Sequence, residues 1–220
     1  MSFEKKKGAS DFLAHYIHRP IENWAVQRLR HTSVTPNQVT IATNVAAYMV
    51  TILYFTGHLL TASLLSFVVG VMDGLDGKLA RAKNMATNLG KLEHAFDLLY
   101  EFSWIAALGG YLSLSSGDPM PLVGAVTAIT LISFYRYCYD TFGKVTGTSL
   151  DDYAPFERAF RRIAGRRNLY NLHILAFILV GQPTLSMYSI PIHAAVTAAV
   201  YAMRVGYHLN KIDNMDRRSP

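Results

Sequence analysis

Residues 73–81 read Asp-Gly-Leu-Asp-Gly-Lys-Leu-Ala-Arg, and they begin where an apolar run of the chain ends. Eight residues separate this stretch from Gly90, and Glu93 and Asp97 follow. Four carboxylates therefore lie close to the edge of a segment long enough to cross hydrocarbon. Acidic side chains are costly at such a position, so they indicate chemistry rather than packing.

The composition of the 220 residues is typical of a membrane protein. Hydrophobic residues make up 51% of the chain and charged residues 16%, whereas a soluble domain has about 25% charged residues. The mean hydropathy is positive. The lone Cys138 cannot form an internal disulfide and has no metal-ligand spacing around it, so it is expected to be a small apolar residue.

Six apolar segments are each close to the ~20 residues that a helix needs to cross a bilayer. They lie near 38–57, 59–76, 92–114, 121–142, 169–186 and 189–209. No repeat or linker divides the chain. We therefore predict an all-α integral membrane protein with one domain over residues 1–220 and six transmembrane helices. Thr35 is expected to cap the first of them, with Pro36 in its first turn.

Residues 10–31 precede the first span and are too short and too polar to cross. Their apolar side chains recur every three or four residues and are interrupted by Pro20, with arginines among them. This pattern predicts an amphipathic helix in the headgroup region, with Trp24 as an interfacial anchor. The alternative is a helix that packs on a soluble core.

The basic residues give an independent check on this topology. If both termini are cytoplasmic, all 21 lysines and arginines lie on or toward the inner side, as the positive-inside rule requires. The loops near residue 58, at 115–120 and at 187–189 have none. The same assignment places the acidic stretch on the cytoplasmic side of a multi-pass integral membrane protein.

The spacing of the acids predicts a metal site. In a helix, Asp73 and Asp76 are three residues apart and Glu93 and Asp97 are four apart, so each pair lies on one face. Four carboxylates from two facing helices form a hard-ligand set that suits Mg²⁺, Mn²⁺ or Ca²⁺. A divalent cation would also remove the repulsion between them.

Small residues and an arginine continue the same stretch. Gly77 and Ala80 follow Asp73 by four and seven residues, and this spacing permits either close helix packing or close approach of a flat ligand to the backbone. The guanidinium group of Arg81 can donate two hydrogen bonds to phosphate oxygens. Alternatively, Arg81 is one of the basic residues that the positive-inside rule places on the cytoplasmic side.

These residues resemble the signature of the CDP-alcohol phosphotransferases, D-x2-D-G-x2-A-R-x8-G-x3-D-x3-D. The first half matches without a gap, at Asp73, Asp76, Gly77, Ala80, Arg81 and Gly90. The family is similarly built from six spans after a surface helix. It often carries a Thr-Pro-Asn element before the first span, here residues 35–37, followed by Thr40.

The resemblance implies transfer of a substituted phosphoryl group, phosphatidyl in type, from a CDP-alcohol to an acceptor hydroxyl, with release of CMP, in phospholipid biosynthesis. It implies two Mg²⁺ or Mn²⁺ ions held by Asp73, Asp76, Glu93 and Asp97, with Asp97 also as the catalytic base. Carried over by position, the residues that bind the CDP-linked donor are Asn37, Thr40, Asp73, Gly77, Ala80 and Arg81. The resemblance also implies a homodimer among membrane lipids, and we expect no nucleic-acid partner.

The second half of the signature departs from the family. In strict register, His94 and Leu98 occupy the positions of the last two aspartates, and Glu93 and Asp97 come one residue early. Such a shift turns a helix by about 100°. The alternative pair is Asp97 with Glu101, which comes three residues late. We prefer Glu93 and Asp97 because the shorter displacement is easier to absorb.

The sequence offers candidate residues for binding the acceptor, and it is compatible with two other functions. Arg136 and the basic cluster from Arg158 to Arg167 are candidates to bind a phosphorylated or anionic acceptor, although a basic cytoplasmic loop is also the topological default. One competing function is a six-span cation transporter that uses the carboxylates, which leaves Gly77, Ala80 and Arg81 unexplained. The other is a family member with impaired catalysis, which the irregular second half favours.

Overall fold

The computed structural model describes residues 10–85 and 93–216, without the side chains of Glu93 and Asp216. Its α-helices are α1 (Arg19–Leu29), α2 (Pro36–Phe55), α3 (Leu59–Ala82), α4 (Glu93–Ser116), α5 (Met120–Thr146), α6 (Leu150–Tyr153), α7 (Pro155–Phe160), α8 (Arg167–Leu179) and α9 (Ser186–Asp216). A π-helical segment, Ala14–His18, leads into α1, and a 3₁₀ turn, Pro183–Leu185, leads into α9. The described residues contain no strand, which agrees with the predicted all-α class.

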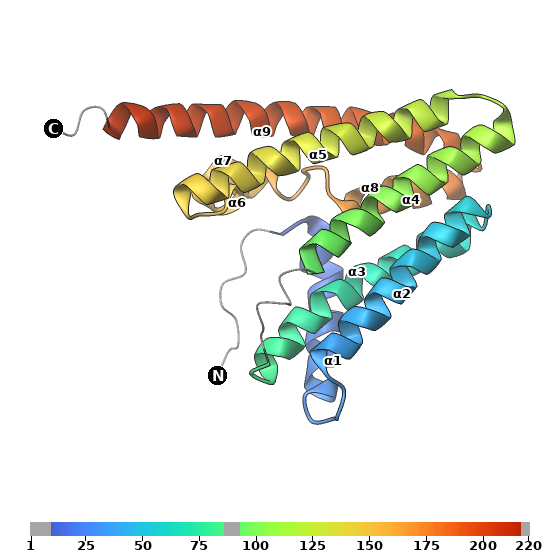
Figure 1. Ribbon diagram of the computed structural model, residues 1–220, viewed down its shortest axis with the longest axis horizontal. Coiled ribbons are helices and arrows are strands. Elements are labelled where there is room, and N and C mark those ends of the chain that lie inside the picture. Colours follow the sequence, from blue (N-terminus) through green and yellow to red (C-terminus); the bar gives the residue numbers. More distant parts are fainter. Residues whose placement is uncertain (1–9, 86–92, 217–220) are drawn as a thin grey trace.

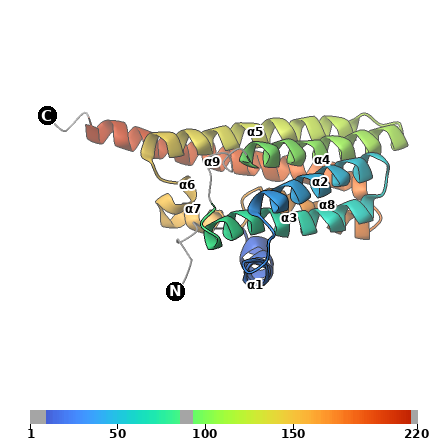
Figure 2. The same ribbon diagram turned by 60° about the horizontal axis from the view of Figure 1, so that its bottom comes forward.

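The long helices form a closed ring. Going round it, α2 packs on α3, α3 on α8, α8 on α9, α9 on α5, α5 on α4, and α4 returns to α2 (Figure 1). Helix α1 stands outside the ring and crosses beneath α3, where Figure 2 shows it nearly end-on. The ring brings α3 and α4 to one site together with α8, which is distant from both in sequence.

The entry to α2 is fixed by its own residues. The Thr35 hydroxyl accepts a hydrogen bond from the Gln38 N–H at 3.3 Å, and Gln38 Oε1 accepts one from the Thr35 N–H at 2.9 Å. This is a complete capping box, and Pro36 occupies the first turn, where no N–H is needed. The predicted cap at Thr35 is confirmed.

Four of the predicted spans are long and apolar enough to cross a membrane by length and composition. They are α2, α3, α5 and the segment Pro183–Met215 that contains α9. The predicted span at 92–114 corresponds to α4, and its status as a span stays a prediction.

The fifth predicted span, near 169–186, extends past the end of the helix that corresponds to it. Helix α8 ends at Leu179, seven residues before the predicted end. The chain turns there at Gly181, whose φ is +74°, and Pro183 follows. A glycine in the left-handed region and a proline just beyond it are typical of a helix end.

The N-terminal helix turns its polar face inward. His18 and Glu22 are buried, while the exposed side chains are mostly apolar and share one face: Phe12, Tyr16, Ile17, Ile21 and Trp24. Helical structure continues through the predicted interruption, since Pro20 lies at the start of α1, directly after the π-helical turn. An apolar face directed away from the protein is the orientation that a membrane-surface helix requires.

Close helix packing positions α5 against α9. A Cβ placed on Gly124 of α5 would overlap the carbonyl oxygen of Met187 in α9, whereas one placed on Gly110 of α4 would meet nothing within 4 Å. Small residues at a helix interface let two backbones approach closely. The α5–α9 pair is therefore fixed at short range.

Candidate functional site

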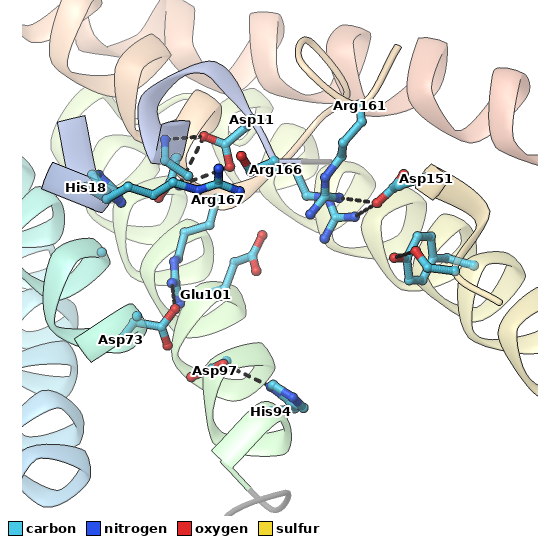
Figure 3. A pocket seen from close by; sticks show the side chains of 18 of the residues that line it. Asp11, His18, Asp73, His94, Asp97, Glu101, Asp151, Arg161, Arg166 and Arg167 are labelled. Atoms are coloured by element: carbon cyan, nitrogen blue, oxygen red, sulfur yellow. Dashed lines mark hydrogen bonds and ion pairs between the residues drawn. The ribbon is translucent and has the colours of Figure 1, made fainter. Parts of the chain in front are cut away.

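A polar cavity of about 460 Å³ lies where α3, α4, α5 and α8 meet the short helices and the N-terminal segment. Its lining includes Asp73 and Gly74 from α3, Asp97 and Glu101 from α4, and Arg136 from α5. The N-terminal segment closes one side and the loop after α7 another (Figure 3). The cavity thus collects charged groups from segments far apart in the sequence.

Asp73 and Asp97 come together, as the motif predicts. The Tyr100 hydroxyl lies between them, 3.1 Å from Asp73 Oδ1 and 3.0 Å from Asp97 Oδ1. Arg167 Nη2 lies 2.6 Å from Asp73 Oδ2 (Figure 3). Its Nη1 also donates to the Tyr100 oxygen. His94 Nδ1 lies 3.7 Å from Asp97 Oδ2.

Asp76 is held by a side chain of α2 and by the backbone of α3. Its Oδ2 accepts a hydrogen bond from the Thr40 hydroxyl at 2.6 Å, and its Oδ1 accepts one from the Gly77 N–H, also at 2.6 Å. Asp76 is buried and does not line the cavity. Two predicted site residues, Thr40 and Asp76, are therefore direct partners across α2 and α3.

The second acidic pair is only partly described. Glu93 is the first residue of α4, but its side chain lies outside the described structure, and so does Gly90. Asp97 and Glu101 both line the cavity from one face of α4. The Glu101 carboxylate is ion-paired with Arg136 and is 2% exposed. The described residues therefore do not decide between Glu93 and Glu101.

The oxygen ligands fit a hard divalent cation. Carboxylates of α3 and α4 converge on one phenol, and the negative charge of Asp73 is balanced by the guanidinium of Arg167. Oxygen-only donor sets of this kind suit Mg²⁺ and Mn²⁺. Within residues 10–85 and the described side chains after Glu93, no three acidic, histidine or cysteine residues form a ready-made metal cluster.

The predicted donor-binding residues flank the carboxyl-terminal half of α3. A Cβ on Gly77 would meet only Arg81 Nη1, at 3.7 Å, so the backbone there is open to a ligand. Asn37 and Arg81 are exposed, and Ala80 is half-buried. None of these four residues lines the cavity. Three of them follow Asp76 on α3, and Asn37 lies at the start of α2.

The opposite wall of the cavity is basic. Arg136, Arg161, Arg166 and Arg167 line it. Asp151 Oδ2 lies 3.0 Å from Arg161 Nη1 and 3.1 Å from Arg166 Nη2, so two guanidinium groups share one carboxylate.

Burial and charge shift the pKa values of this wall. Burial raises the pKa of Asp151, although Arg166 favours its charged form. Burial disfavours the charged form of Arg166 as well, but Tyr201 and Asp151 outweigh this effect and raise its pKa. The Arg166 guanidinium therefore stays charged although it is largely enclosed.

The structure separates the predicted acceptor-binding arginines. Arg136 lines the cavity, whereas Arg158 lies outside its lining and donates to the Asp152 carbonyl at 3.3 Å. Sequence reasoning identified the basic cluster but not which of its members face the cavity. The Arg166-Arg167 pair directly before an apolar helix is the signal that would have identified them.

The N-terminal segment forms a polar wall of the cavity. Glu22 Oε2 pairs with Lys78 Nζ at 2.9 Å and lies directly on Gly74, where a Cβ would overlap it. Burial lowers the pKa of His18, although Asp11 and Glu22 oppose the shift, so His18 is neutral at neutral pH. Sequence reasoning assigned no site role to this segment because its apolar pattern indicated only a membrane surface.

Known proteins resemble the chain in both sequence and structure. A sequence model of the CDP-alcohol phosphatidyltransferase family matches residues 33–156, more than half of the chain. A bifunctional IPC transferase and DIPP synthase of Aquifex aeolicus is 26% identical over 179 residues, which cover 80% of this chain and 40% of that protein. The phosphatidylinositol phosphate synthase of Corynebacterium glutamicum is 28% identical over 120 residues, which cover 54% and 55%.

The fold is that of a solved enzyme. The Mycobacterium tuberculosis phosphatidylinositol phosphate synthase with CDP-DAG bound superimposes with a TM-score of 0.63 at 16% identity, over 86% of this chain and 93% of that one. The same enzyme has been solved with manganese and citrate. The chain spans only about two fifths to one half of the curated relatives it matches. On the match to the family's sequence model, this chain belongs to the CDP-alcohol phosphatidyltransferase family.

Proposed function

We propose that this chain catalyses metal-dependent transfer of a phosphatidyl-type group from a CDP-linked lipid to the hydroxyl of an acceptor alcohol, with release of CMP. The observation that carries the proposal is the convergence of Asp73 and Asp97 on the wall of a polar cavity at the end of apolar helices. Family membership supports it. So does the CDP-DAG bound to the Mycobacterium tuberculosis enzyme, whose fold this chain shares.

The residues that would hold Mg²⁺ or Mn²⁺ are Asp73, Asp76, Glu93 and Asp97. Two such ions, when bound, supply the positive charge that neutralises a diphosphate and orients its oxygens. Asp97 lines the cavity and is half-exposed, so it can take the proton of an acceptor hydroxyl as general base. The Tyr100 hydroxyl lies within hydrogen-bond distance of both carboxylates and can donate to either one.

The donor would bind on the α2–α3 side. Gly77 leaves its backbone open and Ala80 adds little bulk, so a flat base can approach the backbone of α3. Asn37 at the start of α2 and the exposed Arg81 offer polar and cationic groups at the same surface. The Thr40 hydroxyl donates a hydrogen bond to Asp76 and so holds this carboxylate in place next to the donor side.

The acceptor would occupy the cavity itself. Arg161 and Arg166 share one carboxylate, which leaves a net positive charge toward the space. A phosphorylated alcohol matches that charge, because guanidinium groups bind phosphate in a fork geometry. The phosphatidylinositol phosphate synthase among the relatives makes an inositol phosphate the first acceptor to test.

The membrane arrangement is part of the proposal. We propose six spans with the cavity and both termini on the cytoplasmic side. The N-terminal helix then lies in the headgroup region through its exposed apolar face. A lipid donor has its diphosphate at that depth and its chains in hydrocarbon. A homodimer is proposed from the family resemblance alone.

The test is CMP release by the purified protein. Labelled CDP-diacylglycerol is incubated with Mg²⁺ or Mn²⁺ and with inositol phosphate, glycerol phosphate or serine in parallel. We expect release only with a divalent cation and a phosphorylated alcohol. Absence of CMP with every acceptor would contradict the proposal.

Asp97→Asn tests the general base. We expect it to lower turnover by at least a hundredfold, because general-base catalysis contributes about 10²–10⁴ in rate. Asp213→Asn is the matched control, since Asp213 is exposed on α9 away from the cavity. Full activity in a folded Asp97→Asn protein would exclude Asp97 as the base.

A further inference from the structure

A short turn between α7 and α8 carries the arginines of the cavity. Residues 163–165, here called the Gly165 turn, follow Arg161 and directly precede Arg166 and Arg167. All three arginines line the cavity. The position of the turn therefore sets where three positive charges lie.

The backbone of the Gly165 turn is held by side chains of two distant helices. The Tyr135 hydroxyl of α5 donates to the Gly165 carbonyl at 2.7 Å. The Gly165 N–H donates to the Thr197 hydroxyl of α9 at 2.8 Å. His193 Nε2, also on α9, lies 2.8 Å from the Ile163 carbonyl and must donate to it. Three side-chain hydrogen bonds from α5 and α9 therefore hold the backbone of this turn.

The direction of these hydrogen bonds is determined. Tyr135 uses its one hydroxyl hydrogen on Gly165, so Tyr170, 3.2 Å away, donates to the Tyr135 oxygen. Thr197 accepts from Gly165 and donates to the His193 carbonyl at 3.0 Å. Neither hydroxyl has a spare hydrogen with which to satisfy another arrangement of the turn.

Close packing removes the remaining freedom. Gly165 is buried, and a Cβ there would overlap the Tyr170 hydroxyl and come within 3.0 Å of Thr197 Oγ1. The turn cannot move inward against these groups. On its other side, Asp151 holds both Arg161 and Arg166.

Excess positive charge marks this arrangement as a site for an anion. Arg161 and Arg166 both pair with Asp151, so two positive charges meet one negative charge at the cavity wall. Their enclosed Nε atoms have no hydrogen-bond partner within the described part of the chain. An anionic group in the cavity would balance the remaining charge through the accessible parts of these guanidinium groups.

We propose that Tyr135 and Thr197 are positioning residues, which act through the Gly165 turn to aim Arg161 and Arg166 at the anionic group of the acceptor. This inference rests on the proposed function, which places the acceptor in the cavity. Neither residue lines the cavity. Arg167 is also held by Asp73 and Tyr100, so we expect the two substitutions to affect acceptor binding more than donor binding or the chemical step.

The test uses the full chain with Tyr135→Phe and Thr197→Val. Each removes one hydrogen bond to the turn at nearly constant volume, together with the bond of that hydroxyl to Tyr170 or to the His193 carbonyl. We expect the KM for inositol phosphate to rise roughly tenfold, the effect of one lost bond to a buried backbone group. The kcat and the KM for CDP-diacylglycerol should change less than twofold. Thr197→Ser, which keeps the hydroxyl, should restore the KM for the acceptor.

Thr51→Val is the matched control. Thr51 bonds Ser103 between α2 and α4 at 2.7 Å and does not line the cavity, so its loss weakens the bundle without touching the turn. If Thr51→Val raises the acceptor KM as much as Thr197→Val, the effect is general destabilisation and the inference is wrong.

A second measurement does not depend on turnover. Inorganic phosphate, titrated at constant ionic strength, should raise the melting temperature of the wild-type protein, and both variants should need roughly tenfold more phosphate for the same shift. No phosphate response in the wild type would overturn the inference even if CMP is released. Normal CMP release with unchanged acceptor KM in both variants would overturn it while the proposed function stands.

Discussion

At the scale of single residues, the centre of the site is a phenol and not a carboxylate. The Tyr100 hydroxyl contacts Asp73, Asp97 and Arg167, and its side chain is fully buried. It has one hydrogen to donate, so it can bond only one carboxylate at a time. Arg167 supplies the second stabilising contact to Asp73. The relative position of the two carboxylates therefore depends on a residue outside the motif.

Tyr100→Phe should weaken metal binding. The change removes the group that joins α3 to α4 at the carboxylates, and loss of a group that orients metal ligands typically costs 10–100-fold in affinity. A Mn²⁺ titration followed by electron paramagnetic resonance measures it directly.

Tyr137→Phe is the control for this substitution, because Tyr137 is 72% exposed on α5. Equal Mn²⁺ affinity in Tyr100→Phe and the wild type would show that the carboxylates do not need the phenol.

The motif predicted Asp73 and Asp97 but could not predict Tyr100. A buried tyrosine in an apolar helix has the same sequence pattern as a core aromatic, and only its three partners distinguish it. Thr40 was predicted from the resemblance, and the structure adds that its partner is Asp76. Among the cavity arginines, Arg136 was predicted individually. Arg161, Arg166 and Arg167 were predicted only as members of a basic cluster, because their direction depends on the Gly165 turn.

At the scale of elements, helix ends were less predictable than helix existence. Each predicted apolar segment corresponds to a helix, but α8 ends at Leu179 and α9 continues to Asp216. A window of apolar residues does not register a glycine with positive φ such as Gly181. The N-terminal segment was recognised as amphipathic, but periodicity alone does not say which face turns inward.

Gly124→Ala should destabilise the contact of α5 with α9. Its Cβ would overlap a backbone oxygen, which cannot rotate away as a side chain can. Overpacking of this kind typically costs about 1–3 kcal/mol. Thermal unfolding in detergent should show a clearly lower melting temperature.

Gly110→Ala is the matched substitution in an open position of α4. There, alanine should be neutral or stabilising, because it favours the helix over the unfolded chain. A Gly124→Ala protein as stable as Gly110→Ala would mean that the two helices are not in close contact.

At the scale of the whole molecule, the closed ring explains how one site draws on distant segments. Helices α3 and α8 are neighbours only because the ring closes, and this contact brings Arg167 to Asp73. Charge distribution along the chain gives a sidedness that stays a prediction, and nothing in the pattern predicts the order of the helices round the ring. Contacts between distant helices are set by shape, which composition does not encode.

Labelling of introduced cysteines tests the sidedness. In a Cys138→Ser background, Asp118→Cys and Thr148→Cys place one thiol in the exposed turn at either end of α5. An impermeant maleimide added to intact cells should label position 118 and not position 148. The reverse pattern, or labelling of both, would contradict the proposed orientation.

The early end of α8 affects how deep Arg167 lies in the bilayer. A helix of 13 residues rises about 20 Å, whereas the hydrocarbon core is about 30 Å thick. In the proposed six-span arrangement, α8 is shorter than the hydrocarbon core. Arg167 at its start therefore lies deeper in the bilayer than the inner headgroups, or the bilayer is thinner around α8. The reacting phosphate of the donor would then lie closer to the bilayer centre than the headgroups of neighbouring lipids. The enzyme would therefore favour a lipid whose headgroup can move to that depth.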